Sequence, residues 1–433
     1  MGNYQLLIAL AVLVFMIISF LRQKISYGLT AMTCVVFLAL TGVIDTKTAF
    51  SGFSHNTTIL VATMMVVAGA IGKTSIATRI REQMAVIQGK SGFLLLLLVS
   101  LFTLVLTQLM GQTAVMSIML LVIQTMDDDN DISQSRMILL VAALNCAWFG
   151  RFPIGMGAAL PLSTNAYYEG LVNGNSEYLL GMFDILKVGL IPSIALTVYC
   201  LFAWRLIPKQ KIDASAVEAG GSGTRKAVQV SKRDEMIIIG VFLAVMAAFV
   251  FSKKLGNLIY LIPAVGVLVL IYTKIITTQE AISTLTSDMI WMVAGVLVIS
   301  SALSSSGAGE FVGNMVLKIL GSNPSSILVI TVFCITSVLM TTFLSNNGTT
   351  AIMVPIAAST ALAGGMNPKA VVLVVFCSTC LAIGFPTGCA AATMGFAIGN
   401  HNPVKTLKFT IPYLLIGMIS LIISANIFFP VYG

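Results

Sequence analysis

Residues 345–355 read Ser-Asn-Asn-Gly-Thr-Thr-Ala-Ile-Met-Val-Pro, and this short run decides the fold. Its first six residues are polar or glycine, yet it lies near the centre of a long apolar stretch, residues 326–363. One apolar helix crosses a bilayer with about 20 residues, so this stretch is long enough for two helices joined at a polar turn. Irregular backbone at membrane depth must be buried in protein or line a cavity. We therefore expect a re-entrant hairpin whose tip stops inside the membrane.

The whole chain has the composition of a membrane protein. Of its 433 residues, 58% are hydrophobic and only 9% are charged, and the mean hydropathy is +0.99. Soluble domains carry roughly 25% charged residues, so a soluble globular fold is excluded. Apolar runs recur along the chain, which predicts an all-α polytopic membrane protein with about ten transmembrane helices and two re-entrant hairpins.

Three further segments are interrupted by polar residues, glycine or proline. Residues 92–126 are apolar at both ends and polar in the centre, which predicts the other hairpin, with polar side chains at Gln108, Gln112 and Thr113 around Gly111. Residues 137–168 and 370–399 begin as apolar helices and then contain Gly and Pro at mid-membrane depth. Such residues predict two broken helices.

These interruptions recur at a nearly constant spacing. Residues 46–50 match 278–282 at an offset of 232, 111–116 match 348–353 at 237, and 152–155 match 385–388 at 233. We therefore predict two repeats, residues 1–208 and 235–433, joined by a cytoplasmic linker at 209–234. Each repeat contains five spans and one hairpin. Because five is odd, the second repeat is expected to be inverted relative to the first.

The basic residues predict the orientation in the membrane. With the N-terminus outside, 17 Lys and Arg residues fall on the cytoplasmic side and five outside, which satisfies the positive-inside rule. The first hairpin then opens from the cytoplasm and the second from outside. The net charge of +8 comes without a basic stripe interleaved with aromatic residues, so we expect a lipid bilayer and a small solute as partners, and no nucleic acid.

Helix breaks at the midplane expose helix N-termini, which attract anions, and free carbonyl groups, which bind small cations. Two hairpin tips and two broken helices related by inversion should converge on one site. The hydroxyl and amide groups of the second tip suit this role, because their oxygens can bind Na⁺ and their N–H and O–H groups can bind a carboxylate or oxyanion. The candidates there are Ser345, Asn346, Asn347, Gly348, Thr349 and Thr350, with Thr387 in the second broken helix.

Arg151 lies at the break of the first broken helix, where an unpaired charge would cost at least ~2.5 to 3.5 kcal/mol. Two interpretations remain open. Arg151 is a fixed cation that takes the place of a sodium ion beside an anionic substrate, or it pairs with a helix C-terminus.

The run from Ser345 to Pro355 resembles the Ser-Asn-Thr hairpin signature of the divalent-anion/sodium symporters. These are di- and tricarboxylate and sulfate transporters of the ion transporter superfamily, and the resemblance covers nearly the whole chain. It implies a homodimer in which a transport domain carries a divalent anion, often with Na⁺, past a scaffold in an elevator motion. It also implies that Ser345, Asn346 and Asn347 bind substrate and sodium, with Ser345 and Asn346 as Na⁺ ligands. Gly388 and Cys389 correspond to the family's clamp loop, and Gly155 and Met156 to its counterpart in the first half.

The chain departs from the family pattern in its first half. Where the family repeats Ser-Asn-Thr, this chain has Gln108, Leu109 and Met110. Neither clamp carries the family's Thr-Pro-Pro-Asn, and Ser163, Thr164 and Asn165 are the nearby polar candidates in the first broken helix. We therefore expect no cofactor other than, at most, one Na⁺ in the second hairpin.

The resulting hypothesis is a multi-pass plasma-membrane transporter of a small divalent anion, a dicarboxylate, driven by Na⁺ or by anion exchange. Sulfate or another inorganic oxyanion is the alternative substrate, and an ion channel is the alternative class. An enzyme is not expected, because no membrane Ser or Cys is accompanied by a histidine or an acid.

Overall fold

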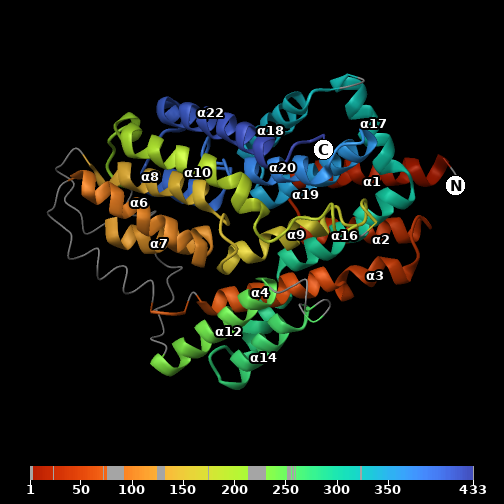
Figure 1. The fold of residues 1–433 in the computed structure, drawn as a ribbon, viewed down its shortest axis with the longest axis horizontal. Coiled ribbons are helices and arrows are strands. Elements are labelled where there is room, and N and C mark those ends of the chain that lie inside the picture. Colours follow the sequence, from red (N-terminus) through yellow and green to blue (C-terminus); the bar gives the residue numbers. More distant parts are fainter. Residues whose placement is uncertain are drawn as a thin grey trace.

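The described part of the chain is helical throughout. The computed structural model describes residues 3–22, 24–71, 73–75, 92–123, 132–173, 175–212, 231–250, 255, 258, 260–321 and 324–432. Within these ranges there are α-helices, short 3₁₀ turns and loops, and no strand (Figure 1). Residues 124–126 of the predicted first hairpin and 213–230 of the predicted linker lie outside them.

The elements of the first half precede the linker. They are α1 (Asn3–Arg22), α2 (Tyr27–Leu40), α3 (Thr46–Ser54), α4 (Asn56–Ile71), α6 (Gly92–Leu109), α7 (Gln112–Ile123), α8 (Gln134–Trp148), η1 (Gly155–Ala158), α9 (Leu160–Ala166), α10 (Asp184–Ala203) and η2 (Trp204–Leu206).

The second half follows a closely similar order. Its elements are α12 (Lys232–Val250), α14 (Ile262–Tyr272), α15 (Thr278–Leu285), α16 (Asp288–Ser305), α17 (Ala308–Leu320), α18 (Ser326–Phe343), α19 (Asn346–Ala363), α20 (Pro368–Thr379), α21 (Ala390–Ile398) and α22 (Pro403–Phe428).

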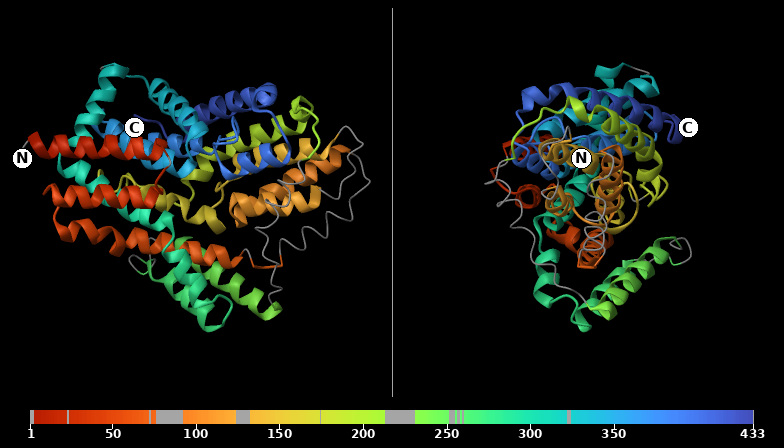
Figure 2. Two further views of the ribbon diagram at one scale, coloured as in Figure 1. Left: turned by 180° about the vertical axis from the view of Figure 1, so that it is seen from behind. Right: turned by 90° about the vertical axis from the view of Figure 1, so that its left-hand side faces the viewer.

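Each predicted hairpin is a pair of helices joined at its polar centre. Helices α6 and α7 meet at residues 110–111 and lie side by side, and α18 and α19 meet at 344–345 (Figures 1 and 2). Each predicted broken helix is likewise interrupted, between α8 and α9 and between α20 and α21. Glycine, proline and polar residues therefore end these helices where the sequence indicated.

The matched sequences 46–50 and 278–282 lie on the short helices α3 and α15, which directly precede α4 and α16. Asp45 begins α3 by accepting a hydrogen bond from the N–H of Thr48 (2.9 Å), and Thr277 begins α15 by accepting one from Glu280 (3.1 Å). Packing repeats as well, since α2 packs against α16 of the second half while α14 packs against α4 of the first. Helix α14, with α12, lies along the edge of the molecule beside α4 (Figure 1).

Four segments of the described chain are long and apolar enough to cross a membrane as helices. They are 46–71, 184–206, 278–305 and 403–428, and the first and third join α3 to α4 and α15 to α16. Other apolar helices, such as α2 and α14, have 10 to 17 residues. Spanning of a membrane is thus supported, while the count of ten spans stays a prediction.

Candidate functional site

The tip of the second hairpin presents polar groups at the start of α19. Ser345 caps the helix, because its hydroxyl accepts a hydrogen bond from the N–H of Gly348 (3.1 Å). The side-chain oxygen of Asn346 accepts a hydrogen bond from the Thr341 hydroxyl (2.9 Å), which leaves the amide NH₂ of Asn346 as a donor. Ser345 and Asn346 are half-buried and Asn347 is exposed, so these groups are within reach of a ligand.

The same tip has oxygens that fit a sodium ion. Ser345 Oγ and Asn346 Oδ1 each accept one hydrogen bond within the protein, and each keeps a second lone pair. Hydroxyl and amide oxygens are suitable ligands for a hard cation. These two residues could therefore hold Na⁺ without losing the bonds that shape the tip.

Behind the tip lies a layer of threonines. The Thr350 hydroxyl donates to the Asn346 carbonyl (2.7 Å), and the Thr379 hydroxyl at the end of α20 donates to the Phe376 carbonyl (2.8 Å). Thr341 also lies 3.1 Å from the Thr379 carbonyl, which connects the hairpin to α20. Thr349 is fully buried, and its hydroxyl has no hydrogen-bond partner among the described residues.

The second helix break lies directly against this tip. The Thr387 hydroxyl donates to the Thr342 carbonyl (2.7 Å). A Cβ on Gly388 would lie 2.6 Å from the Ala382 carbonyl oxygen and 3.1 Å from that of Thr341, so only glycine fits there without movement. The N-termini of α19 and α21 are thereby held near one another, and both carry partial positive charge.

The first hairpin contacts the first break in a similar way. The Gln108 side chain donates to the Trp148 carbonyl (2.8 Å) and accepts from the N–H of Phe152 (3.1 Å). Gly155 has a φ of 56°, and a Cβ there would lie 2.6 Å from the Gln108 carbonyl oxygen. Gln108 of the hairpin and Gly155 of the break loop therefore join these two segments.

The other first-hairpin candidates divide between buried and exposed positions. Asn145 of α8 donates to the Gln112 carbonyl (2.9 Å), and the side-chain nitrogen of Gln112 is buried with no partner among the described residues. Thr113 is exposed. Apart from the residues next to Gly111 in the sequence, no atom lies within 4 Å of a Cβ placed on Gly111. Gln112 as a whole is half-buried, and its amide nitrogen is the buried polar atom that lacks a partner at this tip.

Arg151 lies in the interior, with 2% of its surface exposed. Its Nε donates to the Ala147 carbonyl in the last turn of α8 (3.0 Å) and to the Ser193 hydroxyl (3.1 Å), and its Nη1 lies 3.4 Å from Cys377 Sγ. None of the salt bridges found in the described chain includes it. The guanidinium pairs with a helix C-terminus, as one of the two interpretations proposed. It does not contact the second hairpin tip.

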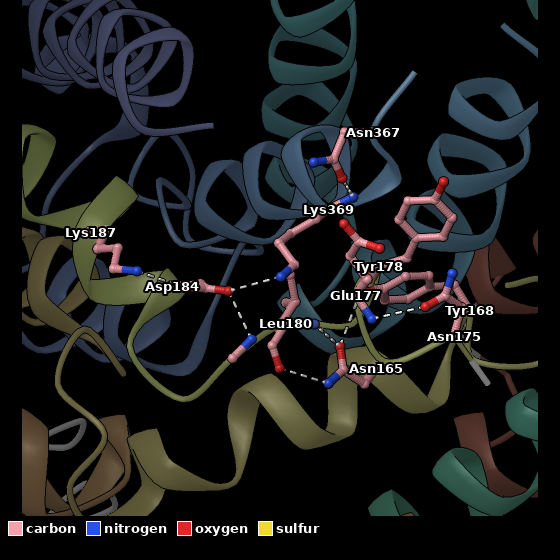
Figure 3. Close-up of polar contacts among 11 residues, drawn as sticks. Asn165, Tyr168, Asn175, Glu177, Tyr178, Leu180, Asp184, Lys187, Asn367 and Lys369 are labelled. Atoms are coloured by element: carbon pink, nitrogen blue, oxygen red, sulfur yellow. Dashed lines mark hydrogen bonds and ion pairs between the residues drawn. The ribbon is translucent and has the colours of Figure 1, made fainter. Parts of the chain in front are cut away.

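Ser163, Thr164 and Asn165 hold α9 and the loop that follows it. Both hydroxyls donate to the Leu160 carbonyl (3.0 and 2.8 Å). The Asn165 amide exchanges two hydrogen bonds with the backbone of Leu180, at 3.0 and 2.8 Å (Figure 3). Their polar atoms therefore support this loop and are not gathered at either tip.

An ion cluster fastens the end of the same loop. The Asp184 carboxylate lies 3.4 Å from Lys187 Nζ and 3.6 Å from Lys369 Nζ, and it accepts a hydrogen bond from the N–H of Gly181 (Figure 3). Lys369 begins α20 and Asp184 begins α10. The cluster thus ties the start of α10 to the start of α20, the helix that ends at Thr379 beside the second hairpin.

The two halves meet where the helices break. Cys389 caps α21 by accepting from the N–H of Ala392 (3.4 Å), and its Sγ lies 3.3 Å from Cys146 Sγ on α8. Helix α21 packs against α7 and α8, and α9 packs against α19. These contacts bring the second break against helices of the first half, and the convergence of both hairpin tips on one site stays a prediction.

Three contacts at the site were absent from the sequence analysis. Thr341 and Thr379 connect the second hairpin to α20, and the Tyr27 ring lies 2.9 Å from a Cβ placed on Gly348. Thr379 forms with Ser378 a polar pair inside an otherwise apolar run, which is a signal that could have identified it. Tyr27 is far away in sequence, and no local pattern connects it with the tip.

The family model and the relatives that this chain resembles are all described as transporters. The family model described as Citrate transporter (CitMHS) matches residues 11–262 and 246–432. The uncharacterized transporter sll0640 of Synechocystis is 25% identical over 49% of this chain and 34% of its own length. The uncharacterized transporter MJ0672 of Methanocaldococcus jannaschii is 25% identical over 58% of this chain and 56% of its own length. The matches thus span about a third to a half of these relatives.

A solved structure shares the fold. The crystal structure of the Alcanivorax borkumensis YdaH transporter matches 97% of this chain and 100% of its own, with a TM-score of 0.61 and 13% sequence identity. At this identity the likeness concerns the fold alone.

Proposed function

The chain belongs to the citrate transporter family, and we propose that it is a secondary active transporter of a small di- or tricarboxylate anion. One observation favours an anion as the transported substrate. The Asn346 oxygen accepts from Thr341, which leaves the amide NH₂ as a donor at the N-terminus of α19, and Thr387 holds the loop before α21 against the same hairpin. Helix N-termini with free N–H donors favour negatively charged ligands.

A dicarboxylate is the proposed substrate, and citrate is included because of the family's description. Carboxylate oxygens can accept from the Asn346 and Asn347 amides and from the first N–H groups of α19 and α21. Sulfate would satisfy the same donors and is the second candidate. Its compact shape would bring it into contact with fewer groups along the tip than a dicarboxylate.

We propose at most one coupling Na⁺, bound by Ser345 and Asn346 in the second hairpin. Gln108 occupies the corresponding part of the first hairpin, and both ends of its amide are committed to the break loop. Anion exchange is the alternative means of coupling. The elevator motion, the homodimer, the inverted arrangement of the halves and the plasma-membrane location are proposed from the family resemblance.

Thermal unfolding of the purified protein tests the substrate class. We expect succinate, malate or citrate to raise the melting temperature in a saturable way, because a ligand that binds only the folded state stabilises it by RT ln(1 + [L]/Kd). Sulfate is measured beside them, with and without Na⁺. A shift with sulfate alone would favour the inorganic oxyanion, and no shift with any of these anions would contradict an anion site.

The two interpretations of Arg151 predict different results for Arg151→Gln. If the buried charge attracts the anion, Arg151→Gln should weaken anion binding about tenfold or more, and Arg151→Lys should recover part of it, since lysine keeps the charge but loses the planar fork. Wild-type uptake should then persist in sodium-free buffer. Unchanged anion affinity with a lower melting temperature would instead assign Arg151 to capping of α8 alone.

A further inference from the structure

A polar cavity lies apart from the hairpins, where α4, α9 and α16 meet. These three helices pack against one another, and α9 lies beside α16 in Figure 1. The cavity has a volume of about 380 Å³. It is lined by His55, Glu169, Gly170, Asn173, Leu297, Ser301, Ser304 and Ser305.

Glu169 brings the charge to this cavity. Its carboxylate accepts a hydrogen bond from the buried Thr57 hydroxyl (2.9 Å), which fixes one oxygen at the start of α4. The lining contains no Lys or Arg, and no salt bridge to Glu169 is found in the described residues. A half-buried carboxylate without a cationic neighbour carries a negative potential that attracts a cation.

Oxygen-bearing side chains form the facing wall. Ser301, Ser304 and Ser305 lie on the last turns of α16, and Asn173 lies on the loop after α9. Hydroxyl and amide oxygens combined with a carboxylate are the ligands of hard cations. The lining contains no Phe, Tyr or Trp ring, which a quaternary ammonium ion would need for recognition.

The fold itself does not require these serines. The offset of 232 that relates the two halves places Ser300 and Ser301 of α16 opposite Ala68 and Gly69 of α4. Ser304 and Ser305 correspond to Gly72 and Lys73, so none of the three positions that match the cavity serines carries a hydroxyl group. The polar wall is therefore a feature of one half, which favours a binding role over a structural one.

The cavity depends on close contact between α9's loop and α16. A Cβ on Gly170 would lie 2.5 Å from Ser301 Oγ and 2.6 Å from Ser301 N, so the loop backbone rests directly on α16. Separation of α9 from α16 would divide the carboxylate from the serine hydroxyls. A cation that binds both would hold them together.

We propose that this cavity binds a small monovalent cation, Na⁺, K⁺ or NH₄⁺, between the Glu169 carboxylate and the hydroxyl groups of α16. The cation stabilises the arrangement in which α9 packs against α4 and α16. This binding does not rest on the identity of the transported anion. It adds a second place, besides the second hairpin, at which cations can influence transport.

Thermal unfolding in matched salts tests the site. The purified full-length protein is measured in choline chloride, and choline is replaced stepwise by Na⁺, K⁺ or NH₄⁺ at constant ionic strength. At least one small cation should raise the melting temperature of the wild type in a saturable way. Glu169→Gln should abolish this shift or require at least about tenfold more cation. Glu177→Gln, an exposed carboxylate in the same loop, is the matched control and should keep it.

Two further variants separate the possible outcomes. Ser301→Ala combined with Ser304→Ala removes hydroxyls without changing charge, and it should also weaken the shift if Glu169→Gln does not fold. Asn346→Ala should retain the part of the shift that depends on Glu169, which distinguishes this cavity from the hairpin. Equal melting temperatures in all four salts, or an undiminished shift in both cavity variants, would overturn the proposal. The anion-induced shift is read separately and reports on the proposed function alone.

Discussion

Asn346→Ala should abolish uptake of the transported anion while leaving expression unchanged. The Asn346 amide is the side-chain donor left free at the half-buried start of α19, and alanine cannot replace it. A hydrogen bond to a charged group contributes about 1.5–3 kcal/mol, so anion binding should weaken about 10- to 150-fold. The fold should persist, because the Thr341 hydroxyl can still donate to the Thr379 carbonyl at 3.1 Å.

Proteoliposome uptake and anion-dependent thermal shifts measure the effect. Asn347→Ala, at the exposed neighbouring position, should also reduce uptake. Asn175→Ala is the matched control, since Asn175 lies on an exposed loop and its side-chain oxygen accepts a hydrogen bond from the N–H of Glu177. Normal uptake by both Asn346→Ala and Asn347→Ala would show that the anion binds elsewhere.

Local sequence predicted the interruptions of the helices well. The polar centres at Gly111 and at Ser345 lie at the two hairpin turns, and Gly150 and Gly388 lie in the two breaks. These positions are predictable because glycine and polar side chains act on the backbone within a few residues. The matched segments 46–50 and 278–282 also fall on equivalent short helices.

What each polar side chain does at an interruption could not be predicted from local sequence. Gln108 was a candidate ligand, yet its amide bonds to residues 40 and 44 positions further along the chain. Asn165 was another, and its amide holds Leu180. A polar residue in an apolar run must find a partner, but the fold decides whether this partner is backbone or ligand.

Contacts between helices far apart in the sequence explain why the surroundings of Arg151 and Glu169 could not be predicted. Arg151 contacts Ser193 and Cys377, which come from α10 and α20, so its burial depends on two helices distant in sequence. Glu169 follows α9 in the sequence, and the cavity around it requires α4 and α16 as well. Periodicity and spacing carry no information on such encounters.

Gly388→Ala should disrupt the site sterically without removing any polar group. The new Cβ would lie 2.6 Å from the Ala382 carbonyl oxygen and 3.1 Å from the Thr341 carbonyl oxygen, both of them backbone atoms. Neither can move as a flexible side chain would, so the break loop must shift away from the hairpin at a cost of about 1–3 kcal/mol. The Thr387 bond to Thr342 and the proximity of the α19 and α21 N-termini would be lost together. We therefore expect anion binding to fall at least about tenfold.

Gly384→Ala provides a matched control for this prediction in the same loop. A Cβ at Gly384 would approach the Leu414 Cδ1 methyl group at 3.3 Å, and the next atoms, in the Thr342 side chain, lie 3.9 Å away. The Leu414 side chain can rotate, so this variant should bind and transport the anion almost as the wild type does. Both variants add one methyl group to the loop between α20 and α21. A difference in anion affinity between them therefore reports on the contact between this loop and the second hairpin. Equal anion affinity in Gly388→Ala and Gly384→Ala would mean that the anion does not require α19 and α21 to be held together.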